Sequence, residues 1–300
     1  MLTRYLRWLH LRWPAGRVER LPLANEDGST NVPGLYIVGD ITGVPLLKFS
    51  SHTGARAVQM ISNDPTFQNR NQSAQRDGNR SLDLVIIGAG VSGLAAAIEA
   101  KQQGLRFEVL EANEPFSTIV NFPKGKPIFT YPTDMVPAGD LQFSEKSKIK
   151  EELIEELHEL SKRHGIEPQV ARVERVECRS GLLECVMADG HNLTAHRVIV
   201  GIGRSGNFRK LQVEGEDLDK VYNRLHDPND FSGQDVLVVG GGDSALESAI
   251  ALATCGCTVT LSYRKAQLSR SKPENVEKIQ MLQEGSVADG AVVEEPSSKR

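Results

Sequence analysis

Residues Leu84 to Ala97 read LVIIGAGVSGLAAA, and this stretch decides the fold that the sequence predicts. An apolar run without charge leads into Gly88-Ala-Gly90-Val-Ser-Gly93 and then into small residues. The pattern predicts a strand, a tight turn and a helix, in which the glycines allow the turn, the approach of a pyrophosphate and close helix packing. Glu111 follows in FEVLEA, where it would accept a ribose hydroxyl. We therefore expect a dinucleotide ligand; an ordinary glycine-rich turn is the alternative.

A second stretch repeats this logic. Residues Gln234 to Ile250 read QDVLVVGGGDSALESAI, with an apolar strand, then Gly240-Gly-Gly242, then Ala245 in the place of the third small residue. The next strand, Thr258 to Leu261, leads to Arg264 and Lys265 and has no acid in the place of Glu111. With help from Arg270, these cations would pair with a 2′-phosphate, which favours NADPH over NADH. The alternative is that they are solvated charges at a strand end.

Composition restricts the class of protein. The chain has 300 residues, a net charge of −4 and 39% hydrophobic residues, which suits one large or two medium globular domains. It has no apolar run of the roughly twenty residues that a membrane span needs, and no secretory leader pattern, so we expect a cytoplasmic protein. The charge balance argues against nucleic-acid binding. The cysteines lack zinc-site spacing and are expected as free thiols: Cys178, Cys185, Cys255 and Cys257.

The N-terminal part contains NEDGSTNVPGLYIVGDITG from Asn25, a turn cluster followed by a strand at residues 35–38 and by Gly39-Asp40. A helix is expected near Thr53 to Ile61. This stretch resembles the closing motif of flavoprotein disulphide-reductase-like enzymes. The resemblance implies that Gly39 and Asp40 hold the ribityl chain of FAD and that the helix points its amino end at the flavin, where a positive end stabilises negative charge. The alternative is that Asp40 only ends a strand or caps a turn.

Taken together, these motifs make the chain similar to the thioredoxin-reductase-like flavoproteins. The end of Val198 to Gly203, with Gly201 and Gly203, also resembles a strand that lies beside FAD in that family. The resemblance implies an α/β fold with two Rossmann-like nucleotide-binding domains, one for FAD and one for NAD(P)H. The Gly-Asp segment closes the chain in the family but comes first here, so we interpret the order as a circular permutation.

The resulting domain prediction has five parts. Residues 1–61 form the permuted C-terminal part of the FAD domain, 62–80 a flexible linker, 81–203 the FAD-binding domain, 204–284 the NAD(P)H-binding domain and 285–300 a disordered tail. Few residues follow Arg264, and only one helix is expected between Ala266 and Leu282, so the second domain is expected to be incomplete, as a truncated product or completed by a partner. The basic amphipathic stretch Met1 to Trp13 is expected to pack its apolar face on this protein or on a partner; a membrane surface is the alternative.

Two further regions complete the prediction. Glu145 to His164 is expected as an amphipathic helix, followed by a meander of three strands. The proline-rich stretch Ser117 to Asp140 is expected to be a loop that borders the flavin. In it, Phe129 and Tyr131 are candidates to pack on the ring, and Lys124 or Lys126 to meet an anion; an ordinary covering loop is the alternative.

One departure from the family bears on the chemistry. Thioredoxin reductases carry a redox Cys-x-x-Cys just before the second glycine motif, and VYNRLHDPNDFSGQDVLVV lacks cysteine there. In this respect the chain is more similar to the branch that includes ferredoxin–NADP reductases and bacillithiol-disulphide reductases. Cys255 and Cys257, with one residue between them, do not replace the missing pair and are expected to be buried small residues.

The function that these motifs imply is an FAD-dependent NAD(P)H oxidoreductase. Hydride would pass from NADPH to FAD, and electrons would then leave to a small redox protein or a small-molecule acceptor. A homodimer is a candidate assembly. No residue is assigned as acid, base or nucleophile, although His52 and His226 are candidate proton donors. Three alternatives stay open: a thioredoxin or low-molecular-weight disulphide reductase that uses external thiols, a flavin monooxygenase, and a non-catalytic FAD-binding redox module.

Overall fold

The computed structural model describes residues 21–69, 81–143, 148–204, 210–265, 267–269 and 271–284. The N-terminal basic stretch, most of the expected linker, Arg270 and the expected C-terminal tail lie outside these residues. Over the described residues the chain divides into two compact units, one with 21–120 and 127–204 and the other with 121–126 and 210–284.

The first unit is an α/β fold, as expected. Its strands are β1 (Leu35–Ile37), β2 (Leu82–Ile87), β3 (Phe107–Glu111), β4 (Pro127–Ile128), β5 (Lys148–Ile149), β6 (Gln169–Val170), β7 (Val173–Arg179), β8 (Leu182–Met187) and β9 (Asn192–Val200). Its helices are η1 (Gly39–Thr42), α2 (Leu47–Asn63), α3 (Pro65–Gln68), α5 (Val91–Gln102), α6 (Ser117–Val120) and α7 (Lys150–Arg163).

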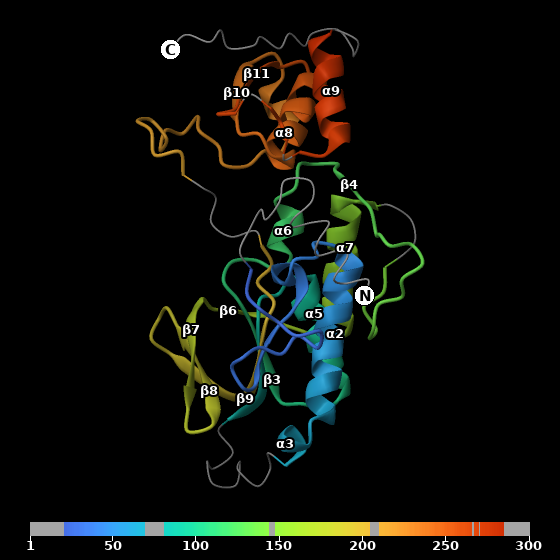
Figure 1. Cartoon of the computed structure of the whole chain (residues 1–300), viewed down its shortest axis with the longest axis vertical. Helices are drawn as coiled ribbons and strands as arrows, with labels where there is room; N and C mark the ends of the chain where they lie inside the picture. The colour runs from blue at the N-terminus through green and yellow to red at the C-terminus, as the bar shows by residue number, and fades with distance from the viewer. Residues whose placement is uncertain are drawn as a thin grey trace. The chain divides into compact units, whose positions relative to one another are not determined.

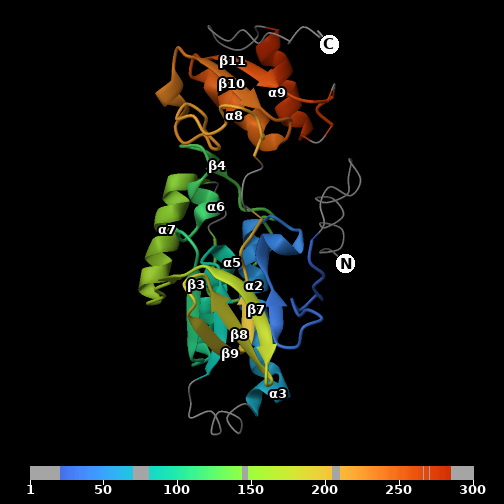
Figure 2. The same cartoon turned by 90° about the vertical axis from the view of Figure 1, so that its left-hand side faces the viewer.

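A seven-stranded sheet forms the centre of this unit, in the order β6-β3-β2-β9-β8-β7, with β1 also paired to β9. The strands β6, β3, β2, β9 and β1 run parallel, whereas β7, β8 and β9 form the expected antiparallel meander. Strand β9 pairs with β8 through its first half and with β1 through its last residues. Figure 2 shows the N-terminal segment on one side of the unit and α7 on the other.

The strand β1 comes from the N-terminal segment, yet it belongs to the same sheet as the first glycine motif. Leu35 pairs with Val198 and Ile37 with Val200, and Val200 pairs in turn with Ile87 on β2. Residues on both sides of the undescribed stretch 70–80 therefore build one sheet. The circular permutation itself stays a prediction.

The helices α2 and α5 lie side by side (Figure 1), and α5 also contacts the strands β2 and β3. Helix α2 is longer than the expected helix near 53–61, because it begins at Leu47 and ends at Asn63. It packs on α5 at unusually short range: a Cβ atom built on Gly54 would lie 2.1 Å from the backbone oxygen of Ser92. Small residues at this contact let the two backbones approach each other.

The start of the expected linker is folded. Residues 62 and 63 end α2, and α3 follows, with Asp64 accepting a hydrogen bond from the Thr66 N–H (2.8 Å). Phe67 is only 1% exposed, and its ring lies 5.3 Å from the Arg197 guanidinium on β9. Arg197 also donates to Asp64 at 2.7 Å. The polar composition of 62–80 does not predict this short helix. One aromatic ring and one capping acid are enough to hold it on the sheet.

Replacing Arg197 by alanine is expected to lower the free energy of unfolding by about 1–3 kcal/mol, because a charge-assisted contact to Asp64 and the contact with Phe67 are lost together. Burial acts to raise the pKa of Asp64, but hydrogen bonds from Arg197 and Thr66 outweigh it and leave the pKa below its ordinary value. The stabilisation is therefore present above the unfolded-state pKa and is lost as pH falls through the lower folded-state pKa.

Urea unfolding of the wild type and of Arg197→Ala, each at neutral and acid pH, checks this prediction. The difference between the two proteins should shrink at acid pH. Arg175→Ala, which removes an exposed cation from β7, is the matched control and should change stability by less than about 0.5 kcal/mol. Equal stability of Arg197→Ala and the wild type would contradict the expected stabilisation by the contacts of Arg197 with Asp64 and Phe67.

Helix α7 confirms most of the expected amphipathic helix, but residues 148–149, which lie inside the expected range, form the strand β5. Leu153 and Leu157 are buried in the helix, whereas Ile149, just before the helix, is exposed. Acids lie in its first turn and basic residues in its last turn, which complements the helix dipole.

The second unit holds η2 (Pro228–Phe231), β10 (Asp235–Val239), α8 (Asp243–Thr254), β11 (Thr258–Ser262) and α9 (Pro273–Gln283). The strands β10 and β11 pair in parallel with α8 as the crossover, the unit that the second glycine motif predicts. Helix α9 is the helix expected between Ala266 and Leu282. The core of this unit is formed by Leu246, Ala249, Leu252, Ala253, Cys257, Val259, Ile279 and Leu282. Among the described helices of both units, none has the length and apolarity of a membrane span.

Candidate functional site

Four parallel strands of the first unit end at the same level. The last ladder pairs join Ile37 to Val200, Val200 to Ile87 and Ile87 to Leu110. Three backbone hydrogen bonds continue the ladder past these pairs, from Val38 N to Val200 O (3.0 Å), Gly201 N to Ile87 O (2.8 Å) and Gly88 N to Leu110 O (2.7 Å). The turns that follow the four strands therefore share one edge, the edge where open α/β sheets bind ligands.

The glycine turn at this edge is tightly packed at one glycine and open at another. A Cβ atom on Gly93 would lie 1.9 Å from the backbone oxygen of Gly88, so only glycine allows this approach of helix to turn. A Cβ atom on Gly90 would meet nothing within 4 Å, so the space in front of the turn is open. Gly90 is also the N-cap of α5 and has no side-chain cap. An open space before a helix N-terminus fits a pyrophosphate.

Ser92, in the first turn of α5, is the point where the other segments meet this turn. A Cβ atom on Gly39 would lie 2.6 Å from the Ser92 Oγ, and one on Gly201 would lie 2.9 Å from it. The Gly39 N–H donates to Thr53 Oγ1 of α2 at 3.0 Å. The structure thus brings Gly39, Gly88 to Gly93 and Gly201 together, although they come from three separate parts of the chain.

Asp40 lies beside this cluster at the start of the turn that follows β1. Its Oδ1 accepts a hydrogen bond from Ser50 Oγ of α2 at 2.7 Å. Burial raises the pKa of Asp40, and the Ser50 hydrogen bond and the Arg204 charge oppose this rise only in part. A buried carboxylate with one oxygen bound keeps acceptor capacity for a ligand hydroxyl.

Glu111, at the end of β3, also faces this edge. Its Oε2 accepts from the Ala89 N–H at 2.8 Å, and its Oε1 accepts from the Asn113 N–H at 3.1 Å. These bonds fix the carboxylate next to the glycine turn. Because a carboxylate offers about four lone-pair sites, it can still accept a ribose hydroxyl.

The proline-rich loop that follows α6 is fastened to α2 by side chains from two turns of that helix. Lys48, 3% exposed, donates to the backbone oxygens of Pro132 (2.8 Å) and Thr133 (3.1 Å), and Ser51 donates to the Leu141 oxygen (2.8 Å). His52 Nδ1 accepts from the Ala138 N–H at 3.1 Å. Burial and the neighbouring Arg56 lower the pKa of His52, which suits an acceptor nitrogen more than a proton donor.

Within the same loop, Phe129 and Tyr131 are each 56% exposed, and their rings stack on each other with centroids 5.9 Å apart. Lys124 and Lys126 belong instead to the second unit, where they pair with Asp227 (3.0 Å) and with Glu247 of α8 (2.6 Å). These lysines thus already neutralise carboxylates. The Lys124 N–H also donates to the backbone oxygen of His226.

The second unit places its glycine motif between β10 and α8. Gly242 is the N-cap of α8, and a Cβ atom on it would meet nothing within 4 Å. Gly240 has a φ of +146°, and a Cβ atom there would lie 3.0 Å from the Ala245 Cβ, so Ala245 takes the close-packing position. Arg264 and Lys265 follow β11 and are exposed. Exposed cations at a strand end attract phosphate groups.

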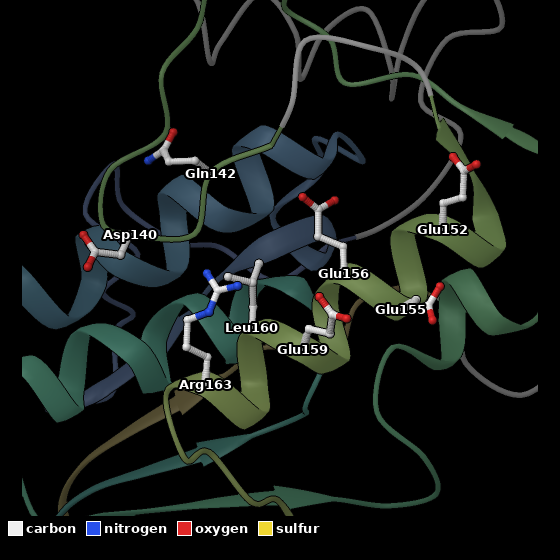
Figure 3. A pocket seen from close by; sticks show the side chains of 8 residues that line it. All are labelled: Asp140, Gln142, Glu152, Glu155, Glu156, Glu159, Leu160 and Arg163. Carbon is white, nitrogen blue, oxygen red and sulfur yellow. The ribbon is translucent and has the colours of Figure 1, made fainter.

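A separate cavity of about 450 Å³ lies in the first unit between α7 and the loop that follows Gly139. Figure 3 shows its lining side chains: Asp140, Gln142, Glu152, Glu155, Glu156, Glu159, Leu160 and Arg163. Most of the charged groups in this lining are carboxylates, and their negative charge repels phosphates. This cavity is therefore not a candidate for a dinucleotide.

The four cysteines are free thiols, as expected. Cys257 is buried and donates to the Phe231 oxygen, whereas Cys255 is only half-buried. Burial raises the pKa of Cys185 to about 12 and also raises that of Cys257. Thiols that stay protonated at neutral pH are poor nucleophiles, so neither Cys185 nor Cys257 suits redox exchange.

Comparisons with known proteins agree with this architecture. A family model described as pyridine nucleotide-disulphide oxidoreductase matches residues 85–293. A ferredoxin–NADP reductase from Ignicoccus hospitalis is 31% identical over 198 residues, which are 66% of this chain and 61% of that protein. A bacilliredoxin reductase from Bacillus subtilis is 28% identical over 62% of this chain and 58% of its own length. The chain thus spans about three fifths of these relatives.

Among solved structures, a bacillithiol disulfide reductase from Bacillus cereus matches with a TM-score of 0.59 and 25% identity. The match covers 71% of this chain and 67% of the other.

Proposed function

The chain belongs to the pyridine nucleotide-disulphide oxidoreductase family, and from this membership we propose that it is an FAD-dependent NADPH oxidoreductase. The family uses a flavin and NAD(P)H. We further propose that the flavin is FAD, that the nucleotide is NADPH and that the electron acceptor is external. The following observations support this choice.

The single observation that carries the proposal is the shared edge of the first unit. Asp40, the turn from Gly88 to Gly93 and Glu111 follow parallel strands whose carboxyl ends lie at one level. In this proposal Gly88, Gly90 and Gly93 take the pyrophosphate at the start of α5, Glu111 takes a ribose, and Asp40 with Gly39 takes the ribityl chain. When bound there, FAD supplies a two-electron acceptor and donor, so the protein supplies binding and orientation.

For the second nucleotide, we propose that Gly240, Gly242 and Ala245 receive the pyrophosphate of NADPH at the start of α8. Arg264 and Lys265 are exposed after β11, and no acid occupies the position that Glu111 has after β3. Guanidinium and ammonium groups favour a 2′-phosphate, whereas an acid would repel it. NADPH is therefore preferred to NADH.

The proposed acceptor is a small redox protein or a small molecule. A disulphide reductase is the second candidate, because relatives with that name match over most of this chain. In that case we propose that the thiol pair is external, because the stretch before the second glycine motif has no Cys-x-x-Cys and both Cys185 and Cys257 are buried. A cytoplasmic location is part of the proposal and is supported by the free thiols. A homodimer is the proposed assembly, and light scattering tests it.

An anaerobic titration tests the proposed function. The purified chain, supplied with FAD, is titrated with NADPH and, in a second cell, with NADH, while the visible flavin band is followed. Bleaching by one equivalent of NADPH and slower bleaching by NADH is the expected result. A protein that binds FAD but is reduced by neither nucleotide would be a flavin-binding module and no reductase. A protein that binds no FAD would contradict the proposed role of the edge with Asp40.

A further inference from the structure

Asp243 is the first residue of α8, but its carboxylate accepts hydrogen bonds from the start of α9. Its Oδ1 accepts from the Lys272 N–H at 2.7 Å and from the Asn275 side-chain amide at 2.9 Å. Lys272 is the N-cap of α9, and its own side chain forms no cap hydrogen bond. Asn275 is a polar side chain that is only 9% exposed. One carboxylate therefore joins the amino ends of α8 and α9.

The glycine turn before α8 is held by the same stretch of chain. A Cβ atom on Gly241 would lie 2.4 Å from the Tyr263 ring, so this ring covers the turn directly. Ser271 Oγ donates to the Gly241 oxygen at 3.0 Å. Tyr263 and Ser271 thus contact the turn, and Asn275 holds α8.

These contacts resolve an electrostatic difficulty. An acid in the first turn of α8 would repel a pyrophosphate that approaches Gly242. Its Oδ1 is turned toward the amino end of α9, where the backbone N–H groups and the helix dipole offset its negative charge. The space beside Gly242 stays open.

We propose that Asp243 and Asn275 are positioning residues for the nicotinamide dinucleotide. By joining α9 to α8 they hold the turn from Gly240 to Gly242 in the shape that receives the pyrophosphate, without touching the reacting atoms. The inference rests on the proposed use of this turn for NADPH and adds α9 to the site.

Binding of NADP⁺ to the oxidised FAD-loaded protein tests the inference without turnover. Asn275→Ala and Asp243→Ala are each expected to raise the Kd by about tenfold, because the turn loses its support. Asp243→Asn keeps an oxygen acceptor and should stay within about threefold of the wild type. In steady state, the alanine variants should raise KM for NADPH by the same factor and leave kcat within about twofold. Gln280→Ala, an exposed amide on α9, is the matched control and should bind NADP⁺ like the wild type.

The outcomes separate this inference from the function on which it rests. A wild type that binds no NADP⁺ overturns both. A wild type that binds NADP⁺ together with an Asn275→Ala protein that binds equally well overturns only the positioning role. If Asn275→Ala does not fold, the comparison of Asp243→Ala with Asp243→Asn decides: rescue by asparagine supports the role, and equal loss in both, or no loss in either, contradicts it.

Discussion

Gly54→Ala is expected to separate α2 from α5 and to abolish retention of the flavin. The added methyl carbon would lie 2.1 Å from the Ser92 oxygen and 2.9 Å from the Ser92 carbonyl carbon, both in the rigid first turn of α5. No rotamer change relieves a clash with backbone, so the helices must move apart. Overpacking of this kind costs typically about 1–3 kcal/mol and occasionally more, and we expect the upper end because the overlap is with the backbone of Ser92 and not with a flexible side chain.

The displacement matters for function because α2 carries both Ser50, the partner of Asp40, and Thr53, the partner of Gly39. Thermal melting of the apoprotein and the FAD content of the purified protein measure the effect. Arg56→Ala, on the exposed side of the same helix, is the control and should retain FAD. A Gly54→Ala protein with normal FAD content would show that the contact between α2 and α5 does not position Asp40.

Asp40→Ala is expected to weaken FAD binding by about 10- to 100-fold, the range that corresponds to loss of a hydrogen bond to a charged group. Its effect on the apoprotein should be the opposite. Because burial raises the pKa of Asp40, the ionised carboxylate costs folding free energy above the unfolded-state pKa. Removing it should leave the apoprotein at least as stable as the wild type at neutral pH.

Titration of apoprotein with FAD by fluorescence, together with urea unfolding without FAD, separates these two effects. Ser50→Ala, which leaves the carboxylate but removes its donor, should give a smaller loss of FAD affinity. Unchanged affinity in Asp40→Ala would exclude Asp40 from the flavin site. Reduced stability of its apoprotein would instead indicate a structural role for the carboxylate.

The local patterns were sufficient to predict much of the architecture. The apolar run before Gly88 became β2, the small residues after it became α5, and the repeat from Gln234 became β10 and α8. These predictions succeed because strand, turn and helix are encoded within one short stretch, where period and glycine spacing act together. The meander of β7, β8 and β9 followed from the same kind of alternation.

The contacts between distant segments could not be predicted in this way. Nothing in the sequence around Gly54 shows that its partner is Ser92, and nothing near Asp243 shows that it holds Asn275. Likewise, the sequence makes Lys124 and Lys126 candidates to meet an anion. Their carboxylate partners, Asp227 and Glu247, lie far along the chain. Phe67 was hidden in a polar stretch. In each case the decisive neighbour is set by the tertiary fold, and single-sequence patterns carry only local information.

The pairing of β1 with the end of β9 has a consequence for synthesis on the ribosome. Residues 35–63 emerge early, but the strand that β1 pairs with and the helix that covers α2 are translated later. Until β9 has left the exit tunnel, the core that buries Phe49, Val58 and Ile61 is incomplete. Such distant pairing means a high contact order and slow closure of the sheet. The apolar face of α2 therefore stays exposed in the nascent chain until the first unit is translated.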